Sequence, residues 1–396
     1  MRGIVLFTVL AAQWVPGGAA AQSAVARWSA WEEVRIGSED EPGNVLTRVS
    51  QVRLGPGGAM LVGQPMDHTI RVYDGAGRAV RSIGRRGSGP GEFEGLGGFG
   101  FLGDTLYASD HRLGRVSLFS ADGGFHTTFI LRSPLIDDHS PPWYLPGSPS
   151  SFLSDGTAMV NATMPVMLME AGIITQVPWL RLARSGQLLD TLAWQDISWK
   201  PVRIVSGGQE FVSRSPFEDP PLVQAMADGS GLAVVERRAA TSRGPARFRV
   251  TRIGIDGDTL WAREYPYTPV RTPGAVVDAG VEQIVERLSR GRGVRTPPRP
   301  AEIERALRSG GHVPEGLPPV TATASGDDGT LWLRREETAA ETVRWEVLDR
   351  NGVLQATLSL PARVTVHAFA GDVLVGVELD ELDVPYVVRY RVTRGG

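Results

Sequence analysis

Histidine is the side chain best suited to proton transfer and metal binding near neutral pH, and the sequence contains six histidines. No two of them stand at a metal-ligand spacing such as i, i+4 on a helix. Two of them, His68 and His111, directly follow the aspartates Asp67 and Asp110, which makes these pairs the first candidates for a site. The six are His68, His111, His126, His139, His312 and His367.

Arginines accompany both Asp-His pairs. Arg112 directly follows His111, and Arg85-Arg86 lies in a Gly-rich segment between the two pairs. Such residues are typical of polar turns, in which aspartate side chains accept hydrogen bonds from loop amides. Imidazole and guanidinium groups on one face are also suited to binding an anion or a sugar. This second interpretation defines a candidate rim of Asp67, His68, Arg85, Arg86, Asp110, His111 and Arg112.

Several other chemistries lack their residues in this sequence. There is no cysteine, which excludes a disulfide framework, a thiolate zinc site and a cysteine nucleophile. No Gly-x-Ser-x-Gly motif is present, so the nucleophile turn of α/β-hydrolases is missing. The Gly-rich segment 84–91 joins two predicted strands, whereas a phosphate loop leads into a helix N-terminus. The net charge of −3 gives no reason to expect nucleic acid or an anionic membrane as a partner.

The elements that position these residues are predicted to be short strands joined by tight turns. The chain of 396 residues contains 48 glycines and 28 prolines beside an apolar fraction of 42%, which is typical of all-β proteins. Glycine after Asp or Asn supplies the positive φ that two-residue hairpins require. Such dipeptides recur at 74–75, 122–123, 256–257 and 351–352.

The turns divide the chain into units of four antiparallel strands. The units begin near residues 49, 96, 147, 221, 319 and 364. The last unit has only three strands, and Val34-Arg35-Ile36-Gly37 near the N-terminus matches the end of a fourth strand. Radial packing buries the open faces of such sheets. We therefore predict a six-bladed β-propeller of four-stranded antiparallel blades, with the N-terminal strand closing the last blade; five or seven blades is the alternative.

One segment, 278–309, has helical instead of strand periodicity. Val281, Ile284, Val285 and Leu288 follow the i, i+3, i+4, i+7 pattern of one helix face. A second short helix is predicted from about residue 301 to 309. The segment would form a helical insertion between blades four and five. It is either a solvated excursion that packs on a blade or a lid or docking element over the channel mouth.

Residues 78–131 resemble the NHL repeat, and the chain more broadly resembles uncharacterised exported six-bladed β-propeller proteins of bacteria. The segment Ile83-Gly84-Arg85-Arg86-Gly87-Ser88-Gly89-Pro90-Gly91-Glu92-Phe93 carries the likeness, with Leu106-Tyr107-Ala108-Ser109-Asp110 and Arg115-Val116-Ser117-Leu118-Phe119. The sequence departs from the repeat at Glu94-Gly95-Leu96, where a proline commonly follows. The resemblance implies a propeller and says little about function, because propellers include binding proteins, lyases and lactonases.

Two function classes remain open. A gluconolactonase-like metal site needs Glu, Asp and Asn ligands in the channel, yet Asn161 lies in a predicted second strand and Asn351 in an outer turn. The amidating-lyase type of NHL enzyme needs several channel histidines, and only His367 lies on a predicted innermost strand. We therefore expect a non-catalytic scaffold that binds a protein, peptide or glycan and needs no cofactor. Its long loops, 132–146 and 195–220, would carry the contacts. The alternative is a lactonase- or lyase-like enzyme with a divalent metal in the channel.

The first 21 residues are predicted to be a signal peptide. Arg2 precedes an apolar stretch from Ile4 to Val15, and Ala19-Ala20-Ala21 supplies the small residues of a cleavage site. The apolar stretch is shorter than the roughly 20 residues that span a bilayer. We expect a mature chain of residues 22–396 that forms a single propeller domain. It would be an exported monomer, periplasmic or extracellular, without a membrane span.

Overall fold

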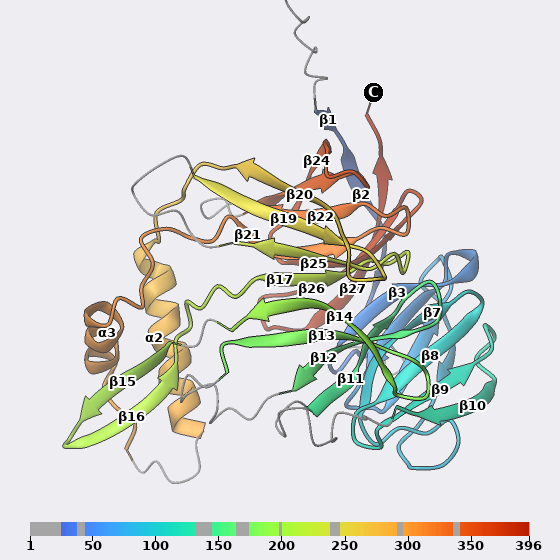
Figure 1. Cartoon of the computed structure of the whole chain (residues 1–396), viewed down its shortest axis with the longest axis horizontal. Coiled ribbons are helices and arrows are strands. Elements are labelled where there is room, and N and C mark those ends of the chain that lie inside the picture. Colours follow the sequence, from blue (N-terminus) through green and yellow to red (C-terminus); the bar gives the residue numbers. More distant parts are fainter. Residues whose placement is uncertain are drawn as a thin grey trace, which may run out of the picture.

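The computed structural model describes residues 25–37, 44–131, 145–163, 174–197, 200–237, 246–290, 296–335 and 341–395 (Figure 1). Within these ranges the chain folds as a six-bladed β-propeller of four-stranded antiparallel sheets, as the repeats predict. The predicted signal peptide lies outside the described residues, as does most of the predicted loop 132–146.

Each blade is a meander whose first strand is innermost. The first strands of most neighbouring blades contact one another, which places them around the central channel. Every first strand begins within two residues of its predicted unit start. Blades one and two contain β3 (Gln51–Leu54), β4 (Met60–Gln64), β5 (Thr69–Tyr73), β6 (Ala79–Ile83), β7 (Leu96–Leu102), β8 (Thr105–Asp110), β9 (Arg115–Phe119) and β10 (Phe125–Ile130). Blades three and four contain β11 (Leu145–Phe152), β12 (Ala158–Thr163), β13 (Gln176–Leu182), β14 (Leu188–Asp196), β17 (Leu222–Ala225), β18 (Leu232–Glu236), β19 (Arg247–Ile253) and β20 (Thr259–Pro266). Blade five and the C-terminal part of blade six contain β21 (Val320–Ser325), β22 (Leu331–Arg335), β23 (Thr342–Leu348), β24 (Leu354–Pro361), β25 (Val364–Ala370), β26 (Val373–Leu379) and β27 (Pro385–Thr393).

The N-terminal strand closes the ring, as predicted. β2 (Ser29–Ile36) is the outermost strand of blade six and pairs antiparallel with β27 from Ser29↔Thr393 to Ile36↔Val387. A feature that the sequence did not indicate precedes it: β1 (Ala26–Arg27) adds a parallel fifth strand to blade five by pairing with β24. The N-terminal segment therefore completes blade six and also joins it to blade five.

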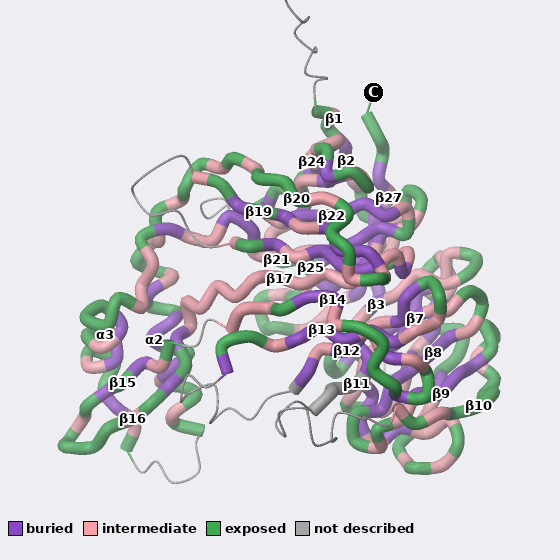
Figure 2. The backbone as a smooth tube through the Cα atoms, viewed as in Figure 1, coloured by how far each residue is buried: buried purple, intermediate pink, exposed green. Residues whose placement is uncertain are grey.

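The hydrophobic core is divided among the blade interfaces. Six clusters of buried residues within the described chain each draw on two neighbouring blades, so that every pair of adjacent blades shares one. Outermost strands such as β6 and β10 are largely exposed (Figure 2). Because strand residues alternate between two faces, each inner strand can pack against the blade on either side. This arrangement fixes the innermost strands around the channel.

A small module extends from one end of the propeller. It contains the hairpin β15 (Pro201–Ser206) and β16 (Gln209–Arg214), from the connection between blades three and four. It also contains α2 (Gly274–Arg290) and α3 (Pro300–Ser309), from the connection between blades four and five (Figure 1). The four elements share a core of their own, which consists of Val202, Ile204, Val281, Ile284, Ile303 and Leu307.

The module confirms the predicted helical insertion and corrects two details. The first helix begins at Gly274, four residues before the predicted 278, because residues 274–277 bury Val277 and continue the apolar face. The prediction of a long loop at 195–220 was wrong, because β15 and β16 occupy its centre. A Gly207-Gly208 turn, with φ of +58° and +81°, joins the two strands. The helical insertion of α2 and α3 packs on the hairpin of β15 and β16 instead of standing alone in solvent.

Candidate functional site

The candidate rim lies at one end of the blades. In an antiparallel meander, the loop between the second and third strands and the connection to the next blade emerge at the same end, here called the loop face. Asp67 and His68 lie in the β4–β5 loop, and residues 110–112 end β8 and begin the β8–β9 loop. Arg85 and Arg86 lie in the connection from β6 to β7. Strand order therefore brings all seven residues to the loop face of blades one and two.

Asp110 acts as a structural residue on this face. It is only 1% exposed. Its Oδ1 accepts hydrogen bonds from the main-chain N–H groups of Gly95, Arg112 and Leu113 at 3.0–3.1 Å, and its Oδ2 accepts one from Glu94 at 2.8 Å. This geometry confirms the turn interpretation for Asp110, whose carboxylate satisfies loop amides that would otherwise be unpaired.

Asp67 and Arg85 are held in ion pairs within the protein. Arg71 Nη2 donates to Asp67 Oδ2 at 3.0 Å, and Arg85 Nε donates to Glu92 Oε1 at 2.7 Å. The hydrogen bond from Arg85, together with one from the Gly89 N–H, lowers the pKa of Glu92. Both charges are balanced locally, which makes Asp67 and Arg85 weaker candidates for ligand contacts.

The two histidines of the rim are not joined to each other. His68 has a left-handed backbone, with φ of +59°, and its buried Nδ1 has no hydrogen-bond partner among the described residues. The ring of His111 lies beside Gly95, where a Cβ would stand 2.6 Å from His111 Cε1. No hydrogen bond between described side chains links the two loops, so the rim stays a prediction.

The channel wall has a simple polar composition. Its innermost strands contain no aspartate and no glutamate, and carry a single arginine, Arg53, and a single histidine, His367. Half-buried amide side chains bridge neighbouring blades along this wall. Gln51 Nε2 donates to the Phe99 carbonyl at 2.9 Å, and Gln224 Oε1 accepts from Thr323 Oγ1 at 3.1 Å. Arg53 and His367 are therefore the only ionisable residues of the six innermost strands.

Arg53 and His367 meet in the channel. Arg53 Nη1 donates to the main-chain carbonyl of His367 at 3.1 Å, and the Val52 N–H donates to His367 Nδ1 at 3.4 Å. Burial lowers the pKa of Arg53. Burial, and then the charge of Arg53, lowers the pKa of His367 to about 4, which keeps the imidazole neutral at pH 7. With Nδ1 accepting, the ring proton of the neutral imidazole resides on Nε2.

The prediction that His367 lies on an innermost strand is confirmed, whereas Arg53 was missed. The signal for Arg53 was present in Gln51-Val52-Arg53-Leu54, a strand in which alternation places Gln51 and Arg53 on the face opposite the buried Val52. A charged residue on an innermost strand is uncommon enough to mark a site.

Tyr107 lies close to both Arg53 and Phe152. Burial raises the pKa of its hydroxyl, and the charge of Arg53 opposes that rise. Its ring packs edge-on against Phe152, with 4.6 Å between the ring centroids. Phe152 in turn lines a pocket of about 560 Å³.

That pocket lies at the turn face, which is the end of the blades that carries the turns between first and second strands. Here it is called the turn-face pocket, and blades two, three and four contribute to it. Gly229, with φ of +70°, lets the turns of blades three and four approach closely: the Ser154 N–H donates to its carbonyl at 2.9 Å. A Cβ on Gly229 would stand 2.6 Å from the Ser154 nitrogen. Its lining includes Phe101, Phe152, Asp155, Arg184 and Asp228.

The charged groups of the turn-face pocket are held in place by the turns. Burial of Asp155 opposes its ionisation, but hydrogen bonds from Thr157 and Arg181 outweigh that effect and lower its pKa. Asp228 Oδ1 accepts from the Ser230 N–H at 3.0 Å. Arg184 is exposed, and its Nε donates to the Gly156 carbonyl at 3.3 Å. The carboxylates of Asp155 and Asp228 and the guanidinium of Arg184 therefore line the same pocket as the two phenylalanines.

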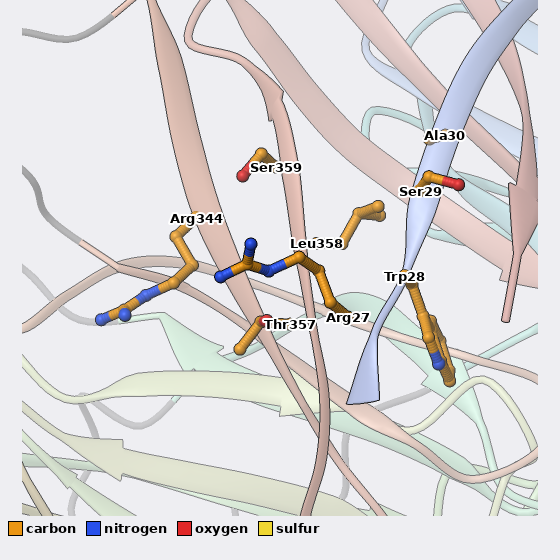
Figure 3. A pocket seen from close by; sticks show the side chains of 8 residues that line it. All are labelled: Arg27, Trp28, Ser29, Ala30, Arg344, Thr357, Leu358 and Ser359. Carbon is orange, nitrogen blue, oxygen red and sulfur yellow. The ribbon is translucent and has the colours of Figure 1, made fainter. Parts of the chain in front are cut away.

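A second pocket, of about 510 Å³, lies on the outer side of the propeller beside the N-terminal strands. Figure 3 shows the side chain of Arg27 extending toward Arg344, Thr357 and Ser359, while Trp28 points away from this group. Arg344 lies 3.6 Å from Glu346, and about half of its side chain is exposed. Open surface arginines of this kind are ordinary in soluble proteins, so the turn-face pocket is the better candidate.

Neither a metal-ligand group nor a spanning helix is found in the described ranges. No set of three or more His, Asp or Glu side chains there is placed to hold a metal ion. In the channel, the positive charge of Arg53 also disfavours a divalent cation. No helix in the described part of the chain is long and apolar enough to cross a membrane.

The chain matches no known family model. No curated protein matches it either. The resemblance to NHL repeats therefore stays a prediction. The fold is similar to solved structures, among them a member of the DUF4221 family from Bacteroides vulgatus, with 9% identity, a TM-score of 0.46 and coverage of 93% of this chain and 99% of that chain. Another is a gluconolactonase from Xanthomonas campestris, with 13% identity, a TM-score of 0.42 and 87% of each chain covered. A third is the PQQ-bound aldose sugar dehydrogenase from Streptomyces coelicolor, with 14% identity, a TM-score of 0.40 and coverage of 93% and 99%. Likeness at this level carries no argument about function.

Proposed function

We propose that this chain is an exported binding protein that holds a small polar ligand, of the size of a mono- or disaccharide, in the turn-face pocket without a catalytic step. The observation that carries the proposal is the pocket itself, which three successive blades form at the channel mouth. Its volume of about 560 Å³ lies within the roughly 300–1,000 Å³ of small-molecule sites.

The lining favours a ligand with both apolar and hydroxyl groups. Phe101 is half-buried and offers a ring edge or face to an apolar surface such as that of a sugar ring. Asp155 and Asp228 are acceptors for hydroxyl groups, and Arg184 is a donor. Because local hydrogen bonds already hold these groups, binding would cost little side-chain ordering.

The loop face supports the proposal less well. Asp67, Arg85 and Asp110 are occupied by internal partners there. Asp155 and Asp228 at the turn face also have internal partners, but Arg184 has only a main-chain carbonyl as partner among the described residues. We therefore place the ligand at the mouth opposite the candidate rim.

A saccharide panel tests the proposed function. Isothermal titration calorimetry with neutral mono- and disaccharides should give saturable binding, and Arg184→Ala and Phe101→Ala should each weaken it about tenfold, the effect of losing one good polar or aromatic contact. Arg305→Ala, an exposed arginine on α3, is the matched control and should bind like the parent protein. Circular dichroism checks that Phe101→Ala remains folded. Binding that is absent, or that survives both pocket substitutions, contradicts the proposal.

Export is the second part of the proposed function. Its support is the N-terminal sequence, with Arg2, an apolar stretch and three alanines up to Ala21. N-terminal sequencing of protein recovered from outside the cytoplasm should start at Gln22, and light scattering should report a monomer. An intact N-terminus on protein that stays in the cytoplasm would overturn this part and leave the binding proposal untouched.

A further inference from the structure

Arg53 has no carboxylate partner among the described residues. Other guanidinium groups of the protein either pair with a carboxylate, as Arg181 does with Asp155 and the buried Arg335 with Glu346 at 3.4 Å, or donate to several main-chain carbonyls, as Arg115 does. Arg53 has one hydrogen-bond acceptor, the main-chain carbonyl of His367. A guanidinium offers several N–H donors, and most of those on Arg53 therefore reach no acceptor in the described part of the chain.

A positive charge in this position is costly unless something balances it. Arginine does not lose its proton in proteins, so burial cannot neutralise it as it neutralises a lysine or a histidine. A half-buried charge such as that of Arg53 has lost part of its hydration, and a counter-ion offsets that loss. The innermost strands supply no aspartate or glutamate as that counter-ion.

The groups around Arg53 also suit a negatively charged guest. His367 directs Nδ1 to the Val52 N–H, which leaves its Nε2–H as a donor. The buried hydroxyl of Tyr107 lies within range of the Arg53 charge, and Ser151 is among its hydrogen-bond partners. Together these residues present a guanidinium, an imidazole N–H and a phenol around the channel, and the innermost strands carry no acidic group that would repel an anion.

We propose that the channel contains an anion-binding site at Arg53, which takes a small oxyanion such as phosphate, sulfate or a carboxylate. Arg53 supplies paired N–H donors and the charge, and His367 and Tyr107 supply neutral donors. The site is distinct from the turn-face pocket, and it does not rest on the saccharide proposal.

The test is anion binding by the full mature chain, with inorganic phosphate, sulfate and acetate as separate probes. In Tris chloride at low ionic strength, each oxyanion that binds at the site should raise the Tm of the protein in a saturable manner. Titration calorimetry should report that the affinity for this oxyanion is at least about tenfold weaker in Arg53→Met. Arg305→Met is the control for general salt effects, and it should respond like the parent protein. A rise in Tm that is equal in the parent and in Arg53→Met, or no response to any oxyanion, overturns the proposal.

A direct measurement keeps the proposal testable if Arg53→Met does not fold. Crystals of the parent protein soaked in selenate should show an anomalous peak within hydrogen-bonding distance of the Arg53 guanidinium. A channel that shows only water at this position contradicts the proposal, as does selenate found only on surface arginines.

Discussion

The indole rings of Trp28 and Trp332 lie 5.9 Å apart between their centroids, in the core between blades five and six. Trp28 comes from the short stretch between β1 and β2, and Trp332 comes from the second strand of blade five. The N-terminal segment thus contributes a large buried side chain to the last blade interface, besides its main-chain hydrogen bonds.

Replacement of Trp28 should therefore weaken the interface between blades five and six. Trp28→Ala leaves a cavity beside Trp332 and Phe369 and should lower the free energy of unfolding by about 3–5 kcal/mol. Chemical denaturation followed by circular dichroism measures the change. Trp31→Ala, at a position that is 50% exposed on β2, is the control and should cost much less. Equal losses in the two variants would show that Trp28 is not a core residue.

Asp110 should prove essential for the loop face of blade two. Asp110→Ala removes the acceptor of four main-chain N–H groups and should destabilise the protein by about 3 kcal/mol, because several of these donors stay buried and unpaired. Asp104→Ala, in the exposed turn at the other end of β8, is the control and should be close to neutral. A stable Asp110→Ala protein would return this residue to the list of candidate ligand contacts.

Glycine at position 84 should be required for the connection between blades one and two. Gly84 has φ of +82°, and a Cβ there would stand 2.3 Å from the ring of the buried Phe93. Gly103 also has positive φ, +57°, but a Cβ there meets nothing within 4 Å. Gly103→Ala should lower the free energy of unfolding by about 1–2 kcal/mol, because alanine is strained in the left-handed conformation. Gly84→Ala should lower it clearly more, because the new Cβ also collides with Phe93. Thermal unfolding of the two variants separates strain from collision. Equal costs would mean that Phe93 moves aside.

His367 should make stability depend on pH below neutrality. Its folded pKa of about 4 lies below its ordinary value of 6.5, so the unfolded chain takes up the proton first as the pH falls. The contribution of the neutral His367 to the free energy of unfolding is complete above about pH 6.5. It is lost as the pH falls toward 4, and the loss amounts to at most roughly 3 kcal/mol. His367→Gln should lose less stability between about pH 7 and about pH 4.5 than the parent protein does. His126→Gln, on the exposed strand β10, should follow the parent. A parent-like pH profile for His367→Gln would contradict the assignment.

The blade pattern was predictable from sequence because its signals are local. Turns such as Asp155-Gly156 and Asn351-Gly352 need positive φ at glycine, and the structure has φ of +80° and +75° there. The missing fourth strand of the last unit was equally visible, since a propeller without it has an open edge. Those signals were enough for the fold, the closure and the position of the helical insertion.

The candidate site was harder to predict because it depends on contacts between distant segments. Asp110 and its amide partners lie near each other in sequence, and its turn role was foreseeable. Arg53 and His367 are separated by almost the whole chain, and only ring closure brings them into contact. The hairpin at β15 and β16 was missed although Gly207-Gly208 marks its turn, because its partner helices lie in another connection.

β2, which completes blade six, is made well before its neighbour β27. Until β27 is made, β2 has no antiparallel partner, and the core cluster around Trp28 lacks Val388, Tyr390 and Val392. The ring therefore cannot close before β27 has been made. Until then each molecule carries β2 as an unpaired strand.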